Sequence, residues 1–389
     1  MSRFLLFIFS FLCCIWVQAQ VIQGKTMTEN GNPLSQVQVY VDGSKINTIS
    51  DAQGRFSIDV KGVSNANLVF QKEAYETKIE SVKSMLGKEN EIRLLKFQEI
   101  EEVRIIPYTE EAYKRYIGYF LNEFLGMDQA NVKLKNPRSL KFSYDKKTKF
   151  LKVKAKEPLI IENKKLGYTV QYDLISFETD FNQRLVSFYG TSFFKEHKAS
   201  KELKVNRMNA FLGSLQHFIR SVVENKVEAE GFWVNYIIRM PNPKYPTASE
   251  LAELKAFQEE AKLQKNLLIP QHIMDISRKK SWNSEFVQGL TKTKLPESEY
   301  TKKVGKDLYL TAKDILQVNY KKFPYSIEKG KIKKSELSMA QTSNLYLDGE
   351  TFLLFPDGNT SDPNLLLSDG DFVKNKVGEM LPLDYKLGD

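Results

Sequence analysis

Cysteine is almost absent from this sequence. The 389 residues contain two cysteines, Cys13 and Cys14, and both lie in the apolar segment at the start of the chain. Without further cysteines, the remaining chain forms no disulfide framework and offers no thiol nucleophile. We therefore expect it to be stabilised by its hydrophobic cores alone.

Histidine is also scarce, and the motifs of the common enzyme classes are missing. The three histidines, His197, His217 and His272, do not stand at metal-binding spacing, and no His-Glu-x-x-His occurs. The chain has no Gly-x-Ser-x-Gly, phosphate-binding loop or dinucleotide fingerprint. Ser-x-x-Lys occurs at scattered positions, as chance produces in a lysine-rich chain: Ser143, Ser192, Ser277 and Ser326. We therefore predict no catalytic, cofactor-binding or metal-binding residue, and no zinc carboxypeptidase site.

Long apolar runs are missing as well, with one exception. Phe4–Val17 is apolar, Arg3 precedes it, and Ala19 supplies a small residue before a cleavage point. This pattern predicts a signal peptide over residues 1–19. We therefore expect an exported protein that is periplasmic, associated with the outer membrane or secreted, without a transmembrane span after cleavage.

Two alternatives to cleavage stay open. The segment would act as an uncleaved anchor if it crossed the membrane, although a membrane helix needs about 20 apolar residues. A lipoprotein would carry lipid on Cys13, although Leu12 is not the small residue that such a site requires.

The excess of one charge sign is small. Lys and Arg number 57 against 48 Asp and Glu, and the net charge of +9 is spread along the chain. Nucleic-acid-binding proteins gather basic residues on one face, so we expect no nucleic-acid partner. A hydrophobic content of 42% excludes global disorder. The length corresponds to about two or three domains.

Short strands separated by turns occupy residues 20–97. Turns are indicated at Asn30–Pro33, Asp42-Gly43 and Asp51–Gly54, and the segments around them are rich in Val, Ile and Phe. This close, even spacing predicts a small β-sandwich. A calcium loop at Asp51 would need several converging oxygen ligands, so we favour a simple turn there.

The same region carries a family pattern. Its segments follow one another in this order: Gly24-Lys25, Asn30-Gly31-Asn32-Pro33-Leu34, Val37-Gln38-Val39, Ser50–Phe56 and Tyr75-Glu76. They resemble the carboxypeptidase-like regulatory domain, a transthyretin-like sandwich of about seven strands. The family pattern has Gly-Tyr where this chain has Ala74-Tyr75. The resemblance implies an accessory or binding module without catalytic residues of its own.

Residues 98–240 predict an α+β domain built around one hairpin. In Glu157–Phe177, an apolar run, a polar turn and a long alternating strand follow one another, as in the inner hairpin of a sheet. Thr109 suits a helix N-cap, and apolar residues at helical spacing follow it up to Gly126. A second helix is predicted over residues 208–222. We expect an antiparallel sheet with two helices on one side.

Two charged features of this region have alternative interpretations. An acidic joint performs acid–base chemistry only in a sheltered cleft, so we favour a solvated joint for Glu99, Glu101 and Glu102. A strand at residues 150–156 has lysine at every second position: Lys152, Lys154 and Lys156. We favour a solvated sheet face there over an anion-binding stripe.

Residues 241–389 are predicted as a mixed C-terminal region of strands and helices. Three prolines between residues 241 and 246 make a stiff joint, and Ser249 suits the cap of a charged helix. The clearest hairpin is predicted over residues 344–355, with its bend at Asp348-Gly349. A short last helix is predicted over residues 372–381. We expect these strands to form a third unit rather than extend the middle sheet.

A second resemblance covers nearly the whole chain after the leader. The segments that carry it are Tyr119–Leu121, Phe124–Gly126, Asn136-Pro137, Glu157–Asn163, Leu166–Tyr168, Asn206-Arg207, Gly213–Phe218 and Leu381–Tyr385. They resemble exported Gram-negative bacterial proteins that carry the regulatory domain at the N-terminus. This resemblance implies an architecture and no particular activity.

Three functional hypotheses follow. The first is a non-enzymatic cell-envelope protein that acts as an interaction or structural module, with another envelope protein or a glycan as partner. The second is a carbohydrate-binding module, suggested by 18 Tyr and 3 Trp, because aromatic faces stack on sugars. The third is a hydrolase with an unrecognised site, which would need facing carboxylates in a deep pocket.

Overall fold

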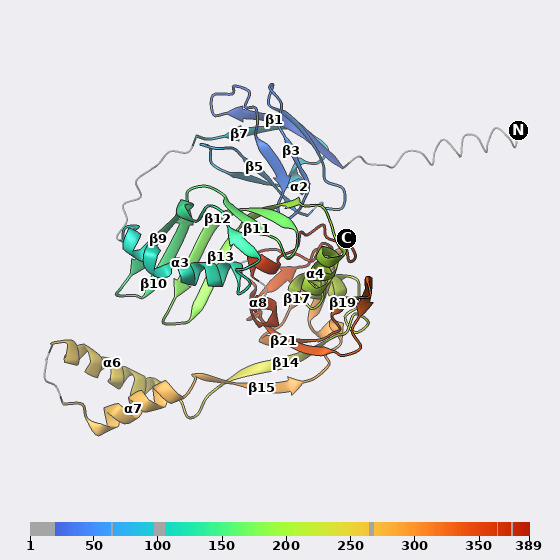
Figure 1. Ribbon diagram of the computed structural model, residues 1–389. Coiled ribbons are helices and arrows are strands. Elements are labelled where there is room, and N and C mark those ends of the chain that lie inside the picture. The colour runs from blue at the N-terminus through green and yellow to red at the C-terminus, as the bar shows by residue number, and fades with distance from the viewer. Residues whose placement is uncertain (1–19, 64, 97–105, 264–267, 364, 375) are drawn as a thin grey trace, which may run out of the picture.

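A computed structural model describes residues 20–63, 65–96, 106–263, 268–363, 365–374 and 376–389 (Figure 1). The N-terminal β-sandwich lies at one end, a sheet covered by helix α3 lies in the middle, and further sheets lie at the other end. The predicted signal peptide and the glutamates at residues 99–102 lie outside the described residues. The strand-rich, α+β fold predicted from the sequence is confirmed.

The sandwich consists of two facing sheets with the orders β4-β1-β7 and β3-β2-β5-β6. Its elements are β1 (Val21–Thr28), β2 (Gln38–Val41), β3 (Asn47–Ile49), β4 (Arg55–Asp59), β5 (Asn67–Gln71), β6 (Lys78–Ser81), α2 (Val82–Met85) and β7 (Glu89–Leu94). In β4, Phe56 and Ile58 point into the core between the two sheets, while their neighbours in the strand are exposed. The predicted sandwich is therefore correct.

Turn chemistry explains two residues of the sandwich. The Asp51 carboxylate accepts hydrogen bonds from the backbone N–H groups of Gln53 (2.9 Å) and Arg55 (2.7 Å), so it closes a turn, as predicted. Ala74 has a φ of 67°, which lies in the left-handed region. Glycine adopts this region without strain, which accounts for the glycine in the family pattern.

Strand β12 is the spine of the middle sheet. The sheet elements are β8 (Val132–Leu134), η1 (Pro137–Ser139), β9 (Leu140–Asp145), β10 (Phe150–Ala155), β11 (Leu159–Asn163), β12 (Tyr168–Asp180) and β13 (Leu185–Glu196). Residues 168–172 of β12 pair with β11, residues 177–180 pair with β10, and nearly its whole length pairs with β13. The hairpin predicted in Glu157–Phe177 is thus the centre of this sheet.

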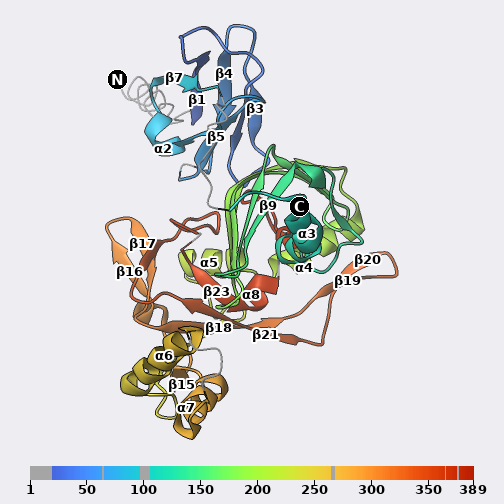
Figure 2. The same ribbon diagram turned by 90° about the vertical axis from the view of Figure 1, so that its left-hand side faces the viewer.

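Helix α3 (Glu110–Leu125) covers one face of the middle sheet (Figure 2). It begins as predicted, because the Thr109 hydroxyl accepts a hydrogen bond from the N–H of Ala112 (3.1 Å). Its aromatic stripe faces inward: Phe120 and Phe124 are fully buried, and the Phe120 ring lies 4.8 Å from the ring of Phe177. The predicted core-facing role of this stripe is confirmed.

The stretch expected as one helix over residues 208–222 forms two, α4 (Lys201–Phe211) and α5 (Leu215–Val223). Gly213 breaks it with a φ of 79°, and a Cβ there would lie 2.6 Å from the ring of Tyr320. The break lets the two helices serve different cores. Phe211 at the end of α4 packs with the middle sheet, whereas Phe218 of α5 packs with the sheet that follows.

The following strands form two more sheets. The larger has the order β15-β14-β18-β21-β23 and the smaller β16-β17-β22. Their elements are β14 (Phe232–Pro241), β15 (Phe286–Lys292), η2 (Glu297–Glu299), β16 (Thr301–Val304), β17 (Asp307–Thr311), β18 (Ile315–Lys322), β21 (Met339–Tyr346), β22 (Thr351–Leu353) and β23 (Leu367–Gly370). The sequence predicted that the strand before residue 240 belongs to the middle domain. This strand, β14, instead pairs with β15 and β18 of the larger sheet.

The prediction of a hairpin over residues 344–355 is wrong. The bend is present, with Asp348 and Gly349 both at positive φ. However, β21 pairs with β18 and β23, and β22 pairs with β17, so the two strands lie in different sheets. Side-chain alternation identified the strands but not their partners.

Two hairpins project from this body. Between β14 and β15 the chain forms the helical pair α6 (Ala248–Leu263) and α7 (Gln271–Trp282). The cap of α6 is Thr247 rather than Ser249: Thr247 Oγ1 accepts from the N–H of Glu250, whose carboxylate accepts from the N–H of Thr247. The second projection is the β-hairpin β19 (Tyr325–Glu328) and β20 (Lys331–Lys334).

The chain closes with α8 (Asp371–Lys374), η3 (Val377–Glu379) and an extended stretch. These replace the single short helix predicted over residues 372–381. We call residues 376–389 the tail segment. It runs from α3 along the middle sheet to the sandwich, because Lys376 pairs with Glu123 (3.3 Å) and the N–H of Leu383 donates to the carbonyl of Gly43 (2.7 Å).

We expect Ala74→Gly to stabilise the sandwich. An alanine in the left-handed region costs roughly 1–2 kcal/mol, and the extra chain entropy of glycine offsets about half of this. The free energy of unfolding should rise by about 0.5–1 kcal/mol, measured by urea denaturation. Ala52→Gly is the control, since Ala52 is an exposed turn residue outside the left-handed region. A gain in the control equal to that of Ala74→Gly would contradict the explanation.

Candidate functional site

The three histidines occupy unrelated environments. His217 is buried among the rings of Phe211, Phe232 and Tyr320. Its Nδ1 accepts a hydrogen bond from the N–H of Gly213 (3.1 Å), and burial lowers its pKa to about 4. His197 bonds the Thr169 hydroxyl and His272 pairs with Glu253 on the exposed helical hairpin. Among the described residues, no His, Cys, Asp or Glu side chains gather as a metal-binding group.

The other charged candidates are engaged in ordinary contacts. Lys152 pairs across the sheet with Glu178 (3.1 Å) on the face away from α3. A groove of about 920 Å³ on the sandwich is lined by Asp51 and Glu89 among others. The Asp51 carboxylate is already held by its own turn, so the groove has no facing pair of free carboxylates. In the part of the chain that the structure describes, no helix is long and apolar enough to cross a membrane.

The most connected polar site is the junction where the tail segment meets α5 and the sandwich. The guanidinium of Arg220 donates three hydrogen bonds to carbonyls: Nε to Asp357 (2.9 Å), Nη1 to Tyr385 (2.8 Å) and Nη2 to Leu383 (2.8 Å). Tyr385 is fully buried beside Phe211. Because these partners lie far apart in the sequence, no sequence pattern announces this site.

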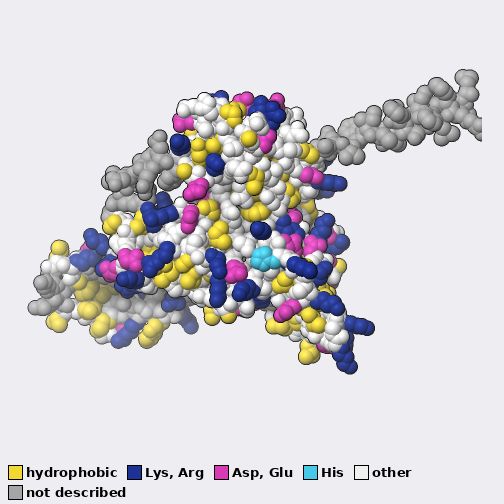
Figure 3. Space-filling model, turned by 45° about the horizontal axis from the view of Figure 1, so that its top comes forward, with side chains coloured by type: hydrophobic (Ala, Val, Ile, Leu, Met, Phe, Trp, Pro, Cys, Tyr) yellow, Lys and Arg dark blue, Asp and Glu magenta, His cyan; other side chains and the backbone are white. Residues whose placement is uncertain are grey.

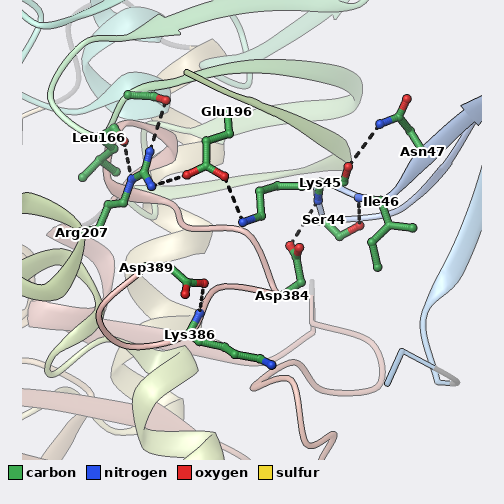
Figure 4. A network of polar contacts seen from close by, with 11 residues as sticks. Ser44, Lys45, Ile46, Asn47, Leu166, Glu196, Arg207, Asp384, Lys386 and Asp389 are labelled. Atoms are coloured by element: carbon green, nitrogen blue, oxygen red, sulfur yellow. Dashed lines mark hydrogen bonds and ion pairs between the residues drawn. The ribbon is translucent and has the colours of Figure 1, made fainter. Parts of the chain in front are cut away.

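A second cationic side chain, that of Arg207, lies in the same junction (Figure 4). Arg207 of α4 is completely buried, donates through Nε to the Leu166 carbonyl (2.7 Å) and lies over the Tyr168 ring. It also pairs with Glu196, whose other oxygen pairs with Lys45 of the sandwich (3.1 Å). Burial raises the pKa of Glu196, but the hydrogen bonds from Arg207 and Lys45 outweigh it and hold the pKa below its usual value.

The tip of the β2–β3 turn inserts against β13. The N–H of Gly43 donates to the carbonyl of Ser192 (2.8 Å), and the Asp42 carboxylate accepts from the N–H of Ser192 (2.8 Å). The Tyr40 hydroxyl bonds Thr191 (3.0 Å). Burial in this contact raises the pKa of Asp42 to about 6. The junction therefore holds the sandwich, the middle sheet and the tail segment together.

The candidate binding surface lies elsewhere, on the projection that we call the arm (residues 238–290). Its inner half is the part of the β14–β15 ribbon beyond β18, where Pro241 still pairs with Phe286. Its outer half is the α6–α7 pair, which closes on a small separate core of Leu254, Ile273 and Ile276. Figures 1 and 2 show it standing clear of the body.

The arm exposes large apolar side chains. Leu263 is 86% exposed, Leu268 91% and Trp282 80%. Further exposed apolar residues on the ribbon are Met240, Phe286, Val287 and Leu290. In Figure 3, hydrophobic side chains lie among charged ones over the arm at the lower left. No motif in the sequence predicted this surface, because apolar residues on a helix normally indicate a core.

The aromatic rings that suggested a glycan site are mostly in the cores. Tyr40, Tyr168, Tyr300 and Tyr385 are fully buried and Trp233 is half-buried. Among the described Tyr and Trp side chains, two are exposed: Trp282, at the end of α7 on the arm, and Tyr189, on β13 of the middle sheet.

Comparison with known proteins identifies the sandwich. Residues 22–105 match the family model of the CarboxypepD_reg-like domain, so this part of the chain is a carboxypeptidase-regulatory-like domain, which is not a catalytic one. A solved Bacteroides fragilis protein, provisionally described as membrane-associated and of unknown function, is similar at 11% identity and a TM-score of 0.16, over 85% of this chain and 97% of that one. That likeness is too weak to transfer a fold or a function. No protein of curated function matches the chain.

We expect Arg220→Met to release the tail segment. The change removes three charge-assisted hydrogen bonds and leaves their carbonyls unpaired, at a cost of about 3 kcal/mol or more. The melting temperature should fall by several degrees, and the Leu383 amide should exchange hydrogen faster. Arg138→Met is the control, because Arg138 is exposed and pairs with the exposed Glu110 and the Tyr113 ring. Equal effects of the two changes would contradict the role of Arg220.

We expect Asp42→Asn to flatten the pH dependence of stability. With a folded pKa of about 6, above its usual value, Asp42 stabilises the fold fully below about pH 4 and loses that contribution as the pH rises through 6. Asparagine keeps the acceptor for Ser192 without the charge. The difference in unfolding free energy, variant minus wild type, should grow by on the order of 1 kcal/mol from pH 4 to pH 7. Glu29→Gln, in an exposed turn, should show no such growth.

Proposed function

We propose that the protein is a non-enzymatic, exported interaction module of the cell envelope, in which a rigid body presents the arm to a partner protein. The observation that carries this proposal is the set of large apolar side chains exposed along a projection that contributes nothing to the main cores. Exposed apolar surface on this scale is a mark of interaction sites. The leader and the lack of further cysteines support export.

The charges of the arm favour a protein as the partner. Acidic and basic side chains on the helices pair with each other: Glu250 with Lys279, Glu259 with Lys262 and Asp275 with Arg278. Helices α6 and α7 have five basic and five acidic side chains, so the helical pair has no net charge that would attract nucleic acid or anionic lipid. The exposed apolar side chains of the arm suit contact with another protein, because the centre of a protein–protein interface is apolar.

The carbohydrate-binding alternative now depends on Trp282 and Tyr189, the exposed Trp and Tyr side chains of the described residues. Trp282 lies on the arm and Tyr189 on β13 of the middle sheet, so each ring would stack on a sugar by itself. The hydrolase alternative would need a sheltered pair of facing carboxylates, and no group of three or more His, Cys, Asp or Glu side chains gathers in the part of the chain that the structure describes.

The test uses photo-crosslinking in the producing cell. A photoreactive residue replaces Leu268 or Trp282 on the arm, and Lys61, exposed on the sandwich, is the control position. We expect one cross-linked protein from both arm positions and none from Lys61.

The cross-linked protein is then purified and tested against an arm-deleted chain. In this chain, residues 243–284 are replaced by an Asn-Gly turn, because the N–H of Asn242 already donates to the carbonyl of Glu285 across the ribbon. The partner should bind the intact chain and lose at least about 100-fold in affinity for the deleted chain. Equal binding to both chains would overturn the arm as the site. Hydrolysis of peptides or glycans by purified protein, abolished by one polar substitution, would overturn the non-enzymatic proposal.

A further inference from the structure

The β19–β20 hairpin concentrates positive charge on a thin projection. From Tyr325 to Lys334 the chain has four lysines, Lys329, Lys331, Lys333 and Lys334, and one acid, Glu328. The turn is tight, with Lys329 and Gly330 at φ of 50° and 73°, which holds Lys329 at the tip. The only ion pair described for these lysines is Lys333 with Glu328 (3.0 Å).

Apolar side chains accompany this charge. Ile327 and Ile332 pair directly across the two strands, so they share one face, and they are 42% and 38% exposed. Leu337 and Met339, on the return to the body, are more exposed still. Figure 2 shows the hairpin projecting from the body, and Figure 3 shows dark blue side chains at the lower right where it lies.

Contacts with α4 fix the hairpin in this position. The Lys201 ammonium donates to the Gly330 carbonyl (3.0 Å), and Asn209 exchanges two hydrogen bonds with the backbone of Tyr325 (2.7 and 2.8 Å). These contacts use backbone groups at the strand edge and leave the Ile327–Ile332 face open. These contacts fix the start of β19 and the turn against α4, and the lysines and isoleucines of the hairpin stay exposed.

We propose that the β19–β20 hairpin binds the surface of an anionic lipid bilayer. Lysines near such a surface gain electrostatic attraction, and adjacent apolar side chains enter the headgroup boundary. The hairpin supplies both features, with charge opposite to that of the lipid, whereas the arm has compensated charges. The proposal is independent of the partner protein proposed for the arm.

The experiment measures co-sedimentation of the full chain without its leader. The vesicles are made of phosphatidylcholine alone or of an equal mixture with phosphatidylglycerol, at about 50 and about 500 mM NaCl. We expect binding to the anionic vesicles at low salt, at least about 10-fold weaker at high salt, and none to the neutral vesicles.

Two variants separate the two contributions. Replacing the four hairpin lysines by glutamine should weaken binding at least about 10-fold, and Ile327→Ser with Ile332→Ser should weaken it about 5-fold. The matched control replaces Lys146, Lys147 and Lys149 by glutamine, in the β9–β10 turn, and should leave binding unchanged. All changed residues are exposed, and Lys149 of the control and Lys329 of the hairpin both have a positive φ. Melting temperatures verify the folding of every variant.

Several outcomes would overturn the proposal. These are no binding of the wild type to anionic vesicles at low salt, an equal loss in the β9–β10 control, or unchanged binding of both hairpin variants. Binding to soluble dextran sulfate without binding to vesicles would assign the hairpin to a polyanion and overturn the lipid. The arm-deleted chain should bind vesicles like the intact chain, so failure of the partner-protein proposal leaves this test interpretable.

Discussion

The guanidinium of Arg220 is the contact on which the arrangement of the units depends. It binds the carbonyls of Asp357, Leu383 and Tyr385, and so fixes the tail segment against α5. The tail segment in turn meets the sandwich, since the Leu383 amide donates to Gly43. One side chain on a short helix therefore holds the tail segment in place, and the contacts of the β2–β3 turn with β13 complete the placement of the first domain. A guanidinium suits this role because its donors are fixed in a plane and carry charge.

The junction around this contact is polar but saturated. Arg207 has a carboxylate, a carbonyl and an aromatic face as partners, which offset the cost of burying its charge. Asp42 accepts hydrogen bonds from two backbone donors, yet burial still raises its pKa. The surrounding fold therefore holds this carboxyl in a place where its charged form is disfavoured. A buried polar network of this kind specifies one geometry rather than adding much stability. That is consistent with a body that keeps its projections in fixed positions.

Local patterns predicted the elements well and their partners poorly. The alternation in β12, the Thr109 cap and the Asp51 turn depend on neighbours in sequence, and each was predictable. The strand after β21 pairs with β17 instead of closing a hairpin, and the break at Gly213 lies against Tyr320. Both features depend on distant parts of the chain. The tail-segment contacts span well over a hundred residues, from Arg220 to Tyr385, so no local signal exists for them. Exposure of the arm was also unpredictable, because apolar residues on a helix normally indicate a core.

The two projections share a structural origin that bears on their roles. Strands β14 and β15 continue as a two-stranded ribbon beyond the end of β18, and β19 and β20 form a hairpin without a third strand. A two-stranded ribbon has no layer to cover its faces, so apolar side chains on it stay in water unless another molecule covers them. Ribbons of this length gain little stability alone, and exposed apolar groups on them carry a risk of aggregation. Their occurrence on both projections, beside cores that are otherwise closed, is why we place the function on the projections and not in the body.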